Sequence, residues 1–345
     1  MTAEDVGLQA VEGIFHMLQI DDEWSIRRPR GFTWWSYRLA QHIDASEPSQ
    51  DDEFQLSRIR IRTEVVDSVM KPPADFVALA NMHAALSAVV WDPHERNISE
   101  CCTGIVHQEN VGWLSRLLST AALLQNDSAH GRAQALAEAV GGVAAASNHP
   151  YSGERPDPDG MLDAPGQMSD QARQVGRRFS GPLLSSLSSF LPQYELLGFS
   201  DETNFSCELP FTGVIPIAAM AALDLPGKSK CPETALLRIY PDIEHPSYGP
   251  GALITLLLPI TLDPNEVPVI VNRLNLTEAK ANTRSSLLGA WCPDPTNNRR
   301  NIIAFTAFLP NVLAEPGILE NQVVFNAVRS RSYGSTDGAL LRVGT

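Results

Sequence analysis

The sequence predicts an α+β fold built from two related modules, because the same order of elements occurs on both sides of residues 147–166. In each half, two strand-like runs precede a helix, two further strands and a second helix. A repeated pattern between two strands supports this prediction. In both copies a tryptophan ends an apolar run, an Asp-Pro turn follows, and Asn-Ile begins the next strand. The first copy has Trp91 and Asn97, and the second has Trp291 and Asn301. Asp and Pro favour turns for backbone reasons, so we interpret both copies as a structural turn rather than a catalytic pocket.

Each element of the first half is predicted from its apolar periodicity and its flanking turn residues. Prolines 72 and 73 suit the first turn of a helix, where the amide has no intrahelical partner, and Asn110 suits an N-cap. The expected elements are a helix at 4–19, strands at 32–43 and 54–66, a helix at 74–87, strands at 88–91 and 98–106, and a helix at 111–125.

The second half repeats this order, and prolines again mark the helix starts. Pro264 precedes the first helix of this half and Pro316 precedes the second. The expected elements are strands at 234–240 and 251–260, a helix at 265–282, strands at 286–291 and 302–309, and a helix at 317–331.

Residues 147–166 separate the two halves. This segment contains four prolines and three glycines with few apolar residues, so we expect no regular element in it. We therefore predict a first α+β module at 1–146, a Pro/Gly-rich linker at 147–166 and a second α+β module at 167–345.

Composition restricts the classes of function. The chain has 345 residues and a formal net charge of -14, which should repel a phosphate backbone, so we expect no nucleic-acid partner. Its first fifteen residues are acidic where a signal peptide is basic, and its most apolar stretch is shorter than the roughly 20 residues of a spanning helix. Five cysteines are an odd number. We expect a cytoplasmic protein with reduced thiols and no membrane partner.

The order of elements resembles the type III secretion chaperone-like fold. The strands "LGAW" and "FTAFLPN" and the following helix are similar to the bacterial YbjN-type branch of that family, with tandem copies over 1–127 and about 170–332. The resemblance implies non-catalytic binding of protein partners. Because the family's unit is usually a single domain that forms homodimers, it implies here a monomeric pseudo-dimer or a weak homodimer.

No complete catalytic or metal-binding motif is present. The sequence Gly227-Lys228-Ser229 matches the last three residues of a phosphate-binding loop, but Ala222 stands where that motif has its first glycine. Potential metal ligands are dispersed along a predicted strand and its flanking turn, which disfavours a closed zinc site, and we expect neither a metal nor a cofactor. These residues are Asp92, His94, Glu95, Cys101, Cys102 and His107.

A thiol site is a further possibility that the sequence does not favour. Such a site would use Cys292 as the nucleophile, with Asp294 nearby in the sequence, and His245 as the base that removes the proton from the thiol. Nothing in the sequence brings His245, in a predicted hairpin turn, toward Cys292. We therefore interpret Cys292 as a buried thiol.

Arginines alternate with isoleucines in "LSRIRIRTE". A strand there places Arg58, Arg60 and Arg62 on one face and Ile59 and Ile61 on the other. One interpretation is a solvated face paired with carboxylates of neighbouring strands. The other is a docking surface for an acidic peptide or a phosphate-bearing ligand.

The most aromatic stretch lies at 32–43. In a strand, Trp34 and Trp35 project to opposite sides, so we expect one ring in the core and the other, with Phe32 or Tyr37, at a protein contact. The arginine face is the expected rim of that contact. The candidate protein-binding residues are Trp34, Trp35, Tyr37, Arg58, Arg60 and Arg62.

Three functions remain open from the sequence. The first is an intracellular protein-binding adaptor or chaperone-like protein without chemistry of its own. The second is an enzyme with a site assembled between the two modules. The third is a small-molecule or nucleotide sensor that uses the arginine face or residues 297–300. An enzyme is expected to show a pocket with several titratable groups of shifted pKa, and an adaptor an apolar or basic groove.

Overall fold

The computed structural model describes most of the chain. The described residues are 5–50, 54–175, 178–201, 204–211, 234–280, 285–296 and 301–335. They fold into two compact units, each treated by itself below. The first unit comprises Met1–Met168 together with Asn275–Ala290, and the second comprises Ser169–Leu274 together with Trp291–Thr345. Residues 147–166, the predicted linker, thus belong to the first unit, and residues 275–290 join it from the other half of the chain.

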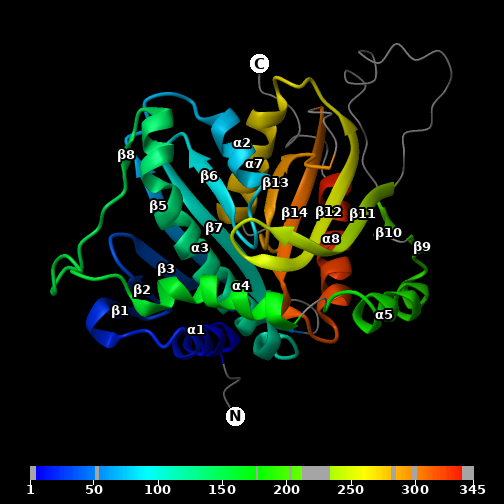
Figure 1. The fold of residues 1–345 in the computed structure, drawn as a ribbon, viewed down its shortest axis with the longest axis horizontal. Coiled ribbons are helices and arrows are strands. Elements are labelled where there is room, and N and C mark those ends of the chain that lie inside the picture. Colours follow the sequence, from blue (N-terminus) through cyan, green and yellow to red (C-terminus); the bar gives the residue numbers. More distant parts are fainter. Residues whose placement is uncertain are drawn as a thin grey trace. The chain divides into compact units, whose positions relative to one another are not determined.

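The first unit is built on an antiparallel sheet in the order β1-β2-β3-β5-β7-β6, and two short strands, β4 and β8, also pair with β5 (Figure 1). The strands are β1 Ser25–Arg28, β2 Gly31–Trp35, β3 Ala40–Ala45, β4 Ser49–Gln50, β5 Gln55–Asp67, β6 Ala88–Asp92, β7 Asn97–Val106 and β8 Val143–Ala144.

Helices cover one face of this sheet. Phe15 of α1 packs edge-on against Phe32 of β2, and Gln125 of α3 accepts a hydrogen bond from Thr63 of β5. Ile59 and Ile61 of β5 are buried on this covered face. The other helices of the unit are short. The bounds are α1 Val6–Met17, η1 Asp22–Trp24, α2 Ala74–Asn81, α3 Val111–Val140 and η2 Gly160–Asp163, and α4 Ala164–Val175 continues into the second unit.

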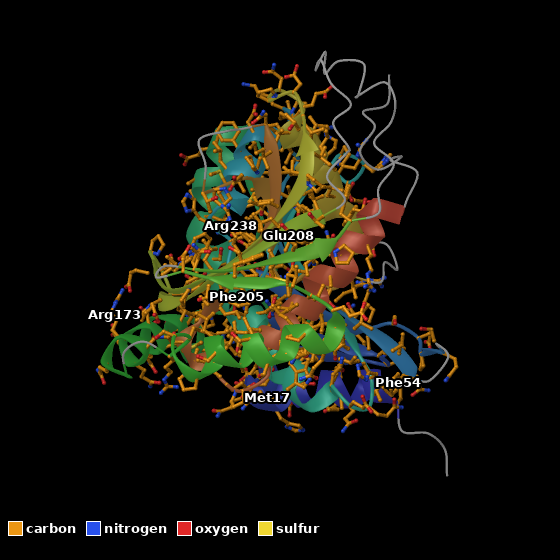
Figure 2. All side chains as sticks on the ribbon, turned by 90° about the vertical axis from the view of Figure 1, so that its right-hand side faces the viewer. Met17, Phe54, Arg173, Phe205, Glu208 and Arg238 are labelled. Carbon is orange, nitrogen blue, oxygen red and sulfur yellow. The ribbon has the colours of Figure 1, made fainter. Side chains whose placement is uncertain are left out.

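The second unit contains an antiparallel sheet in the order β13-β14-β12-β11-β10-β9. Phe205 of β10 lies in its core, whereas Glu208, on the opposite face of the same strand, is exposed (Figure 2). The strands are β9 Gly198–Ser200, β10 Phe205–Pro210, β11 Thr234–His245, β12 Gly249–Thr261, β13 Ala290–Pro293 and β14 Ile302–Pro310. The helices are α5 Pro182–Phe190, η3 Leu191–Tyr194, α7 Val267–Lys280, η4 Asn311–Leu313 and α8 Ile318–Ser335. From Asn275 onward α7 belongs to the first unit.

The two sheets have the same connectivity. In each sheet the first four strands of the order, β1-β2-β3-β5 or β9-β10-β11-β12, follow the chain, and a helix comes after the fourth of them. A hairpin then completes the sheet. Its second strand, β7 or β14, pairs with the fourth strand, and its first strand, β6 or β13, forms the edge. The predicted α+β class is confirmed. In both halves a helix, two strands and a second helix follow the first strands as predicted, although each half has more strands before that helix than the two predicted, five in the first half and four in the second. Trp91 on β6 and Trp291 on β13 occupy the same strand of their sheets.

Four predicted elements and the predicted linker differ from the structure. The helix predicted at 74–87 ends at Asn81, and the strand predicted at 286–291 is β13, Ala290–Pro293. The linker at 147–166, expected to hold no regular element, contains η2 and the start of α4.

Residues 32–43 form a hairpin of β2 and β3 rather than one strand, because the chain reverses at Ser36–Leu39 without a glycine or proline to mark the turn. The helix predicted at 111–125 continues to Val140, and Gly141 ends it with a φ of 66°. No helix within the described ranges is long and apolar enough to cross a bilayer.

Candidate functional site

A cavity of about 470 Å³ lies within the first unit, on the sheet face opposite α1 and α3. Side chains of β1, β3, β5, β6 and β7 form its floor, and the last turn of α7, which belongs to this unit, contributes Leu276, Ala279 and Lys280. Because side chains alternate along a strand, the arginines of β5 point to this face while Ile59 and Ile61 point to the core. The predicted alternation is therefore confirmed.

Arg58 is the buried member of the arginine row. It is 5% exposed, and its guanidinium donates to Thr103 Oγ1 at 2.9 Å and to the Ser285 carbonyl at 3.2 Å. Burial lowers its pKa to about 10, with a further contribution from Arg60, while the Glu278 carboxylate opposes the change. Arg58 thus fastens segment 285–287 to the sheet.

Arg60 and Arg62 are half-buried and line the cavity. Arg60 donates to the Lys280 carbonyl at 3.4 Å. The Arg62 Nε donates to Ser99 Oγ at 3.1 Å, and its Nη2 lies 3.1 Å from Glu64 Oε1. These contacts place both guanidinium groups at the cavity floor.

The strand register brings further charged groups beside these arginines. His42 of β3 lies opposite Arg62, and Asp44 lies opposite Arg60. Arg28 of β1 reaches both residues of β3, with Nη1 3.4 Å from Asp44 Oδ1 and Nη2 2.9 Å from His42 Nδ1. A Cβ at Gly31 would lie 2.2 Å from the Ile43 carbonyl oxygen and 2.6 Å from Asp44 Oδ1, so a side chain there would displace this corner of the cavity.

His42 is held in its neutral form. Burial lowers its pKa, and the nearby Arg28 and Arg62 lower it further, while Asp44 acts in the opposite direction. Thr33 Oγ1, 3.0 Å from His42 Nδ1, completes its immediate polar surroundings. An anion placed beside this ring would favour its protonation.

Asp92 and Lys280 form an ion pair at another edge of the cavity. Burial disfavours ionisation of Asp92, but hydrogen bonds from Lys280 and from the amides of His94 and Glu95 outweigh it and lower its pKa. Asp92 is 6% exposed in its side chain and Lys280 is 57% exposed. The lysine therefore places positive charge where the cavity meets solvent.

Positive charge dominates the lining. Four cationic side chains, those of Arg28, Arg60, Arg62 and Lys280, face two carboxylates, those of Asp44 and Asp92. The Glu64 carboxylate, which is not part of the lining, also pairs with Arg62, so ion pairs offset part of this positive charge. Guanidinium groups in fixed orientations bind carboxylates and phosphates through paired hydrogen bonds. The arrangement is suited to holding an anion.

The tryptophans predicted to border a protein contact are both internal. Trp34 is fully buried beneath the helices, and Trp35, on the other face, is 6% exposed. The cover of Trp35 is the Pro/Gly-rich segment: its Nε1 donates to Ser147 Oγ at 3.1 Å, its ring meets the His149 ring edge-on at 4.8 Å, and its carbonyl accepts from Arg155 at 2.7 Å. A segment of the same unit therefore covers this ring, where the sequence predicted a contact with the other module or with a partner.

Tyr37 is half-buried and lies against another ring. It stacks on His130 of α3, with ring centroids 6.2 Å apart and planes inclined by 25°. Of the six predicted protein-binding residues, the structure thus brings Arg60 and Arg62 together in the cavity and places the other four in internal contacts. The sequence reasoning missed Arg28, His42, Asp44 and Lys280, although the two-residue spacing of His42 and Asp44 was a readable sign that they share a face.

The cysteine pair lies on the predicted strand, now β7. Both residues border the cavity, and the strand register places the Cys101 side chain on the face of Arg62 and the Cys102 side chain on the face of Ile61. Burial raises the pKa of Cys101 to about 12 and that of Cys102 well above its usual value. Within the described ranges, no three His, Cys, Asp or Glu side chains gather closely enough to hold a metal ion.

The thiol considered in the second unit is also buried. Cys292 Sγ lies 3.5 Å from Thr306 Oγ1, and burial raises its pKa to about 12. The His245 ring stacks on Tyr248 and lies tilted against Phe308. A thiol that resists ionisation is a poor nucleophile. Residues 227–229 and 297–300, considered for phosphate or nucleotide binding, lie outside the described residues.

Comparison of the chain with protein-family models, with curated proteins and with solved structures gives no match.

Proposed function

We propose that the protein is a non-catalytic binding protein whose first unit takes an anionic ligand into the basic cavity. The observation that carries the proposal is that four cationic side chains, those of Arg28, Arg60, Arg62 and Lys280, line one concave space of about 470 Å³. A cavity of this size lies within the range of about 300–1,000 Å³ that is common for small-molecule sites. Of the functions left open by the sequence, this corresponds to the small-molecule sensor.

The chemistry of the lining favours binding over catalysis. Nucleophilic catalysis needs an ionisable nucleophile beside a base, and burial keeps the Cys101 thiol protonated. The Asp92 carboxylate is bound by Lys280 and by two backbone amides, so its hydrogen-bonding capacity is used in holding the cavity wall. These groups position a ligand and have no evident role in a reaction.

A protein-binding adaptor or chaperone-like role is a second proposal, and one observation in the second unit supports it. Among the described strands, β9 is the last of its sheet, and Leu197 and Phe199 are 68% and 60% exposed there. An exposed sheet edge with apolar side chains suits the addition of a strand from a partner chain. This role would use a different surface from the cavity.

The anion-binding proposal is tested by isothermal titration with inorganic phosphate and with sulfate at constant ionic strength. We expect the wild-type protein to bind phosphate, and Arg62→Met to weaken this binding at least tenfold, because it removes a guanidinium group from the cavity floor. Arg38→Met is the matched control, since Arg38 is an exposed arginine of the same unit, beside Tyr37.

Two outcomes would contradict the proposal. One is that neither phosphate nor sulfate binds, nor any other anion tried. The other is that Arg38→Met weakens binding as much as Arg62→Met does, which would indicate a general effect of net charge. Circular dichroism of both variants establishes that they are folded.

A further inference from the structure

We propose that the β9 edge of the second unit binds an extended segment of a partner protein, with alternating apolar residues at the centre of that segment and basic residues at its ends. The inference rests on the second proposed function, the protein-binding role, and names the chemistry of the partner. Three properties of this edge support it: its outward-facing backbone groups, its exposed side chains and the charge around it.

Strand β9 directs part of its backbone away from its own sheet. The Leu197 carbonyl accepts from the Glu208 amide of β10 at 3.4 Å. In an antiparallel pair every second residue bonds to the partner strand, so Phe199 also bonds to β10, whereas Gly198 and Ser200 direct their N–H and C=O groups to the other side. No described strand pairs with β9 on that side. An added strand can therefore bond to Gly198 and Ser200.

The side chains of β9 divide into an inner and an outer face. A Cβ at Gly198 would lie 2.5 Å from Leu191 and 2.6 Å from Phe205, so the inner face of the strand fits closely on the core. Leu197 and Phe199 project from the outer face and are exposed. Cross-strand contact with apolar side chains of an added strand would remove both from water.

The charge around β9 is acidic. Residues 182–211, which contain α5, η3, β9 and β10, include four acidic residues and no lysine, arginine or histidine. Glu195 and Glu208 are exposed, and neither forms an ion pair with another described residue. On the face of Phe199, the first basic side chain in the register is Arg238 of β11, two strands away or about 10 Å (Figure 2). Charge complementarity thus favours a basic partner and disfavours a second copy of this acidic edge.

The inference is tested by fluorescence anisotropy with three labelled peptides at physiological ionic strength. The first is acetyl-RRVTVTVRR-amide, the second has glutamate in place of each arginine, and the third is the arginine peptide with N-methylated central amides. We expect the first peptide to bind at least tenfold more tightly than the second, because the glutamates meet the acidic edge. It should exceed the third by the same factor, because N-methylation removes the donors that pair with β9.

Variants of the protein separate backbone pairing from charge. Ser200→Pro removes an outward N–H without removing a bond to β10 and should weaken binding at least tenfold, whereas Ser200→Ala should stay within twofold of the wild type. Glu195→Gln combined with Glu208→Gln should weaken binding at least threefold. Glu109→Gln combined with Glu138→Gln is the matched control, since both glutamates are exposed in the first unit. Circular dichroism establishes that the variants are folded.

The outcomes distinguish this inference from the proposal on which it rests. If the glutamate peptide binds as tightly as the arginine peptide and Ser200→Pro weakens both, strand addition stands and the basic partner is wrong. If no peptide binds, or if N-methylation and Ser200→Pro have no effect, strand addition at β9 fails as well. Sedimentation without peptide tests the other occupant, because a dimer that Ser200→Pro dissociates would assign the edge to a second copy and overturn the basic partner.

Discussion

The fourth strands of the two sheets, β5 and β12, occupy the same place in the strand order but differ in the chemistry of one face. On β5, arginines alternate with the buried Ile59 and Ile61. On β12, which has no charged residue, the buried Ile254 and Leu256 alternate with Leu253, Thr255 and Leu257. One apolar face is therefore enough to specify this topology, because β5 has the place of β12 in the strand order although its second face is charged.

Physical reasoning supports this interpretation. A shift of one residue in strand pairing moves every side chain to the other face, so a single continuous apolar face already fixes the register. Both strands are central, each hydrogen-bonded to two neighbours. Such a strand can bear charges on its second face only where other groups pair with them, as Glu64, Ser99 and Thr103 do on β5 and β7.

The largest expected effect is on the free energy of unfolding, and it compares β6 with β13, the edge strands at equivalent places in the two sheets. Trp291 is fully buried, with Phe305 and Tyr333 edge-on to its ring at 5.5 and 5.1 Å, whereas Trp91 is half-buried. We expect Trp291→Ala to lower the free energy of unfolding by about 3–5 kcal/mol. Trp91→Ala should cost about 1–2 kcal/mol, because less area leaves water on folding. Urea denaturation measures both, and equal losses would show that the two strands do not differ in packing.

The second prediction concerns the buried arginine of β5. Arg58→Met keeps the apolar stem but removes the hydrogen bonds to Thr103 and Ser285 and leaves the fully buried Glu278 without this nearby cation. We expect a loss of about 3 kcal/mol, the order observed when one member of a buried charged network is removed.

Two controls accompany this variant. Arg60→Met, on the same face but half-buried, should cost less than about 1 kcal/mol. Leu257→Met places the same new residue on β12 and should cost less than about 1.5 kcal/mol. A variant Arg58→Met as stable as the wild type would mean that the cost of burying the cation equals the strength of its hydrogen bonds.

Local patterns explain why much of the fold was predictable. The Arg-Ile alternation of β5 and the apolar run of β14 are periodic within a few residues, and both strands were assigned correctly from that periodicity. Trp35 was assigned to the right kind of element, but its cover lies 112 residues away at Ser147, in a segment whose prolines and glycines show no periodicity. A segment without regular structure can still bury an aromatic ring, and sequence patterns do not report this.

The cavity was predictable only in part, for the same reason. Arg60 and Arg62 follow from alternation along one strand. Lys280 pairs with Asp92 across 188 residues, on a helix turn that the chain supplies from its other half. His42 was placed on the same strand as Trp35, because the reversal at Ser36–Leu39 has no glycine or proline, so its position opposite Arg62 was not foreseen.

A smaller effect of opposite sign is expected on β12. Thr255 is fully buried, and its hydroxyl finds no hydrogen-bond partner among the described residues. Thr255→Val replaces this hydroxyl with a methyl group of similar size, so we expect the protein to become more stable by about 1 kcal/mol. On β5, Thr63 donates to Gln125, and Thr63→Val should instead destabilise the protein. Thermal unfolding measures both, and a loss of stability in Thr255→Val would reveal a partner for its hydroxyl.

The smallest expected effect is on the pH dependence of the charged face. Burial, Arg28 and Arg62 lower the native pKa of His42 below its ordinary value of 6.5. Below pH 6.5, His42 is therefore protonated in the unfolded chain before it is protonated in the native state. This contribution to stability is therefore complete above pH 6.5 and is lost as the pH falls toward the native pKa. His107 and His130, whose pKa values are also lowered by burial, act in the same direction, so the slope must be compared with that of a variant. In urea denaturation between pH 7.5 and 5, His42→Gln should lose less stability than the wild type, whereas His16→Gln, at an exposed site, should follow the wild type.

With phosphate bound, protonation of His42 becomes favourable, so the affinity of the wild type should rise as the pH falls, and that of His42→Gln should rise less. An unchanged slope in His42→Gln would mean that the ring does not sense the arginines of the cavity.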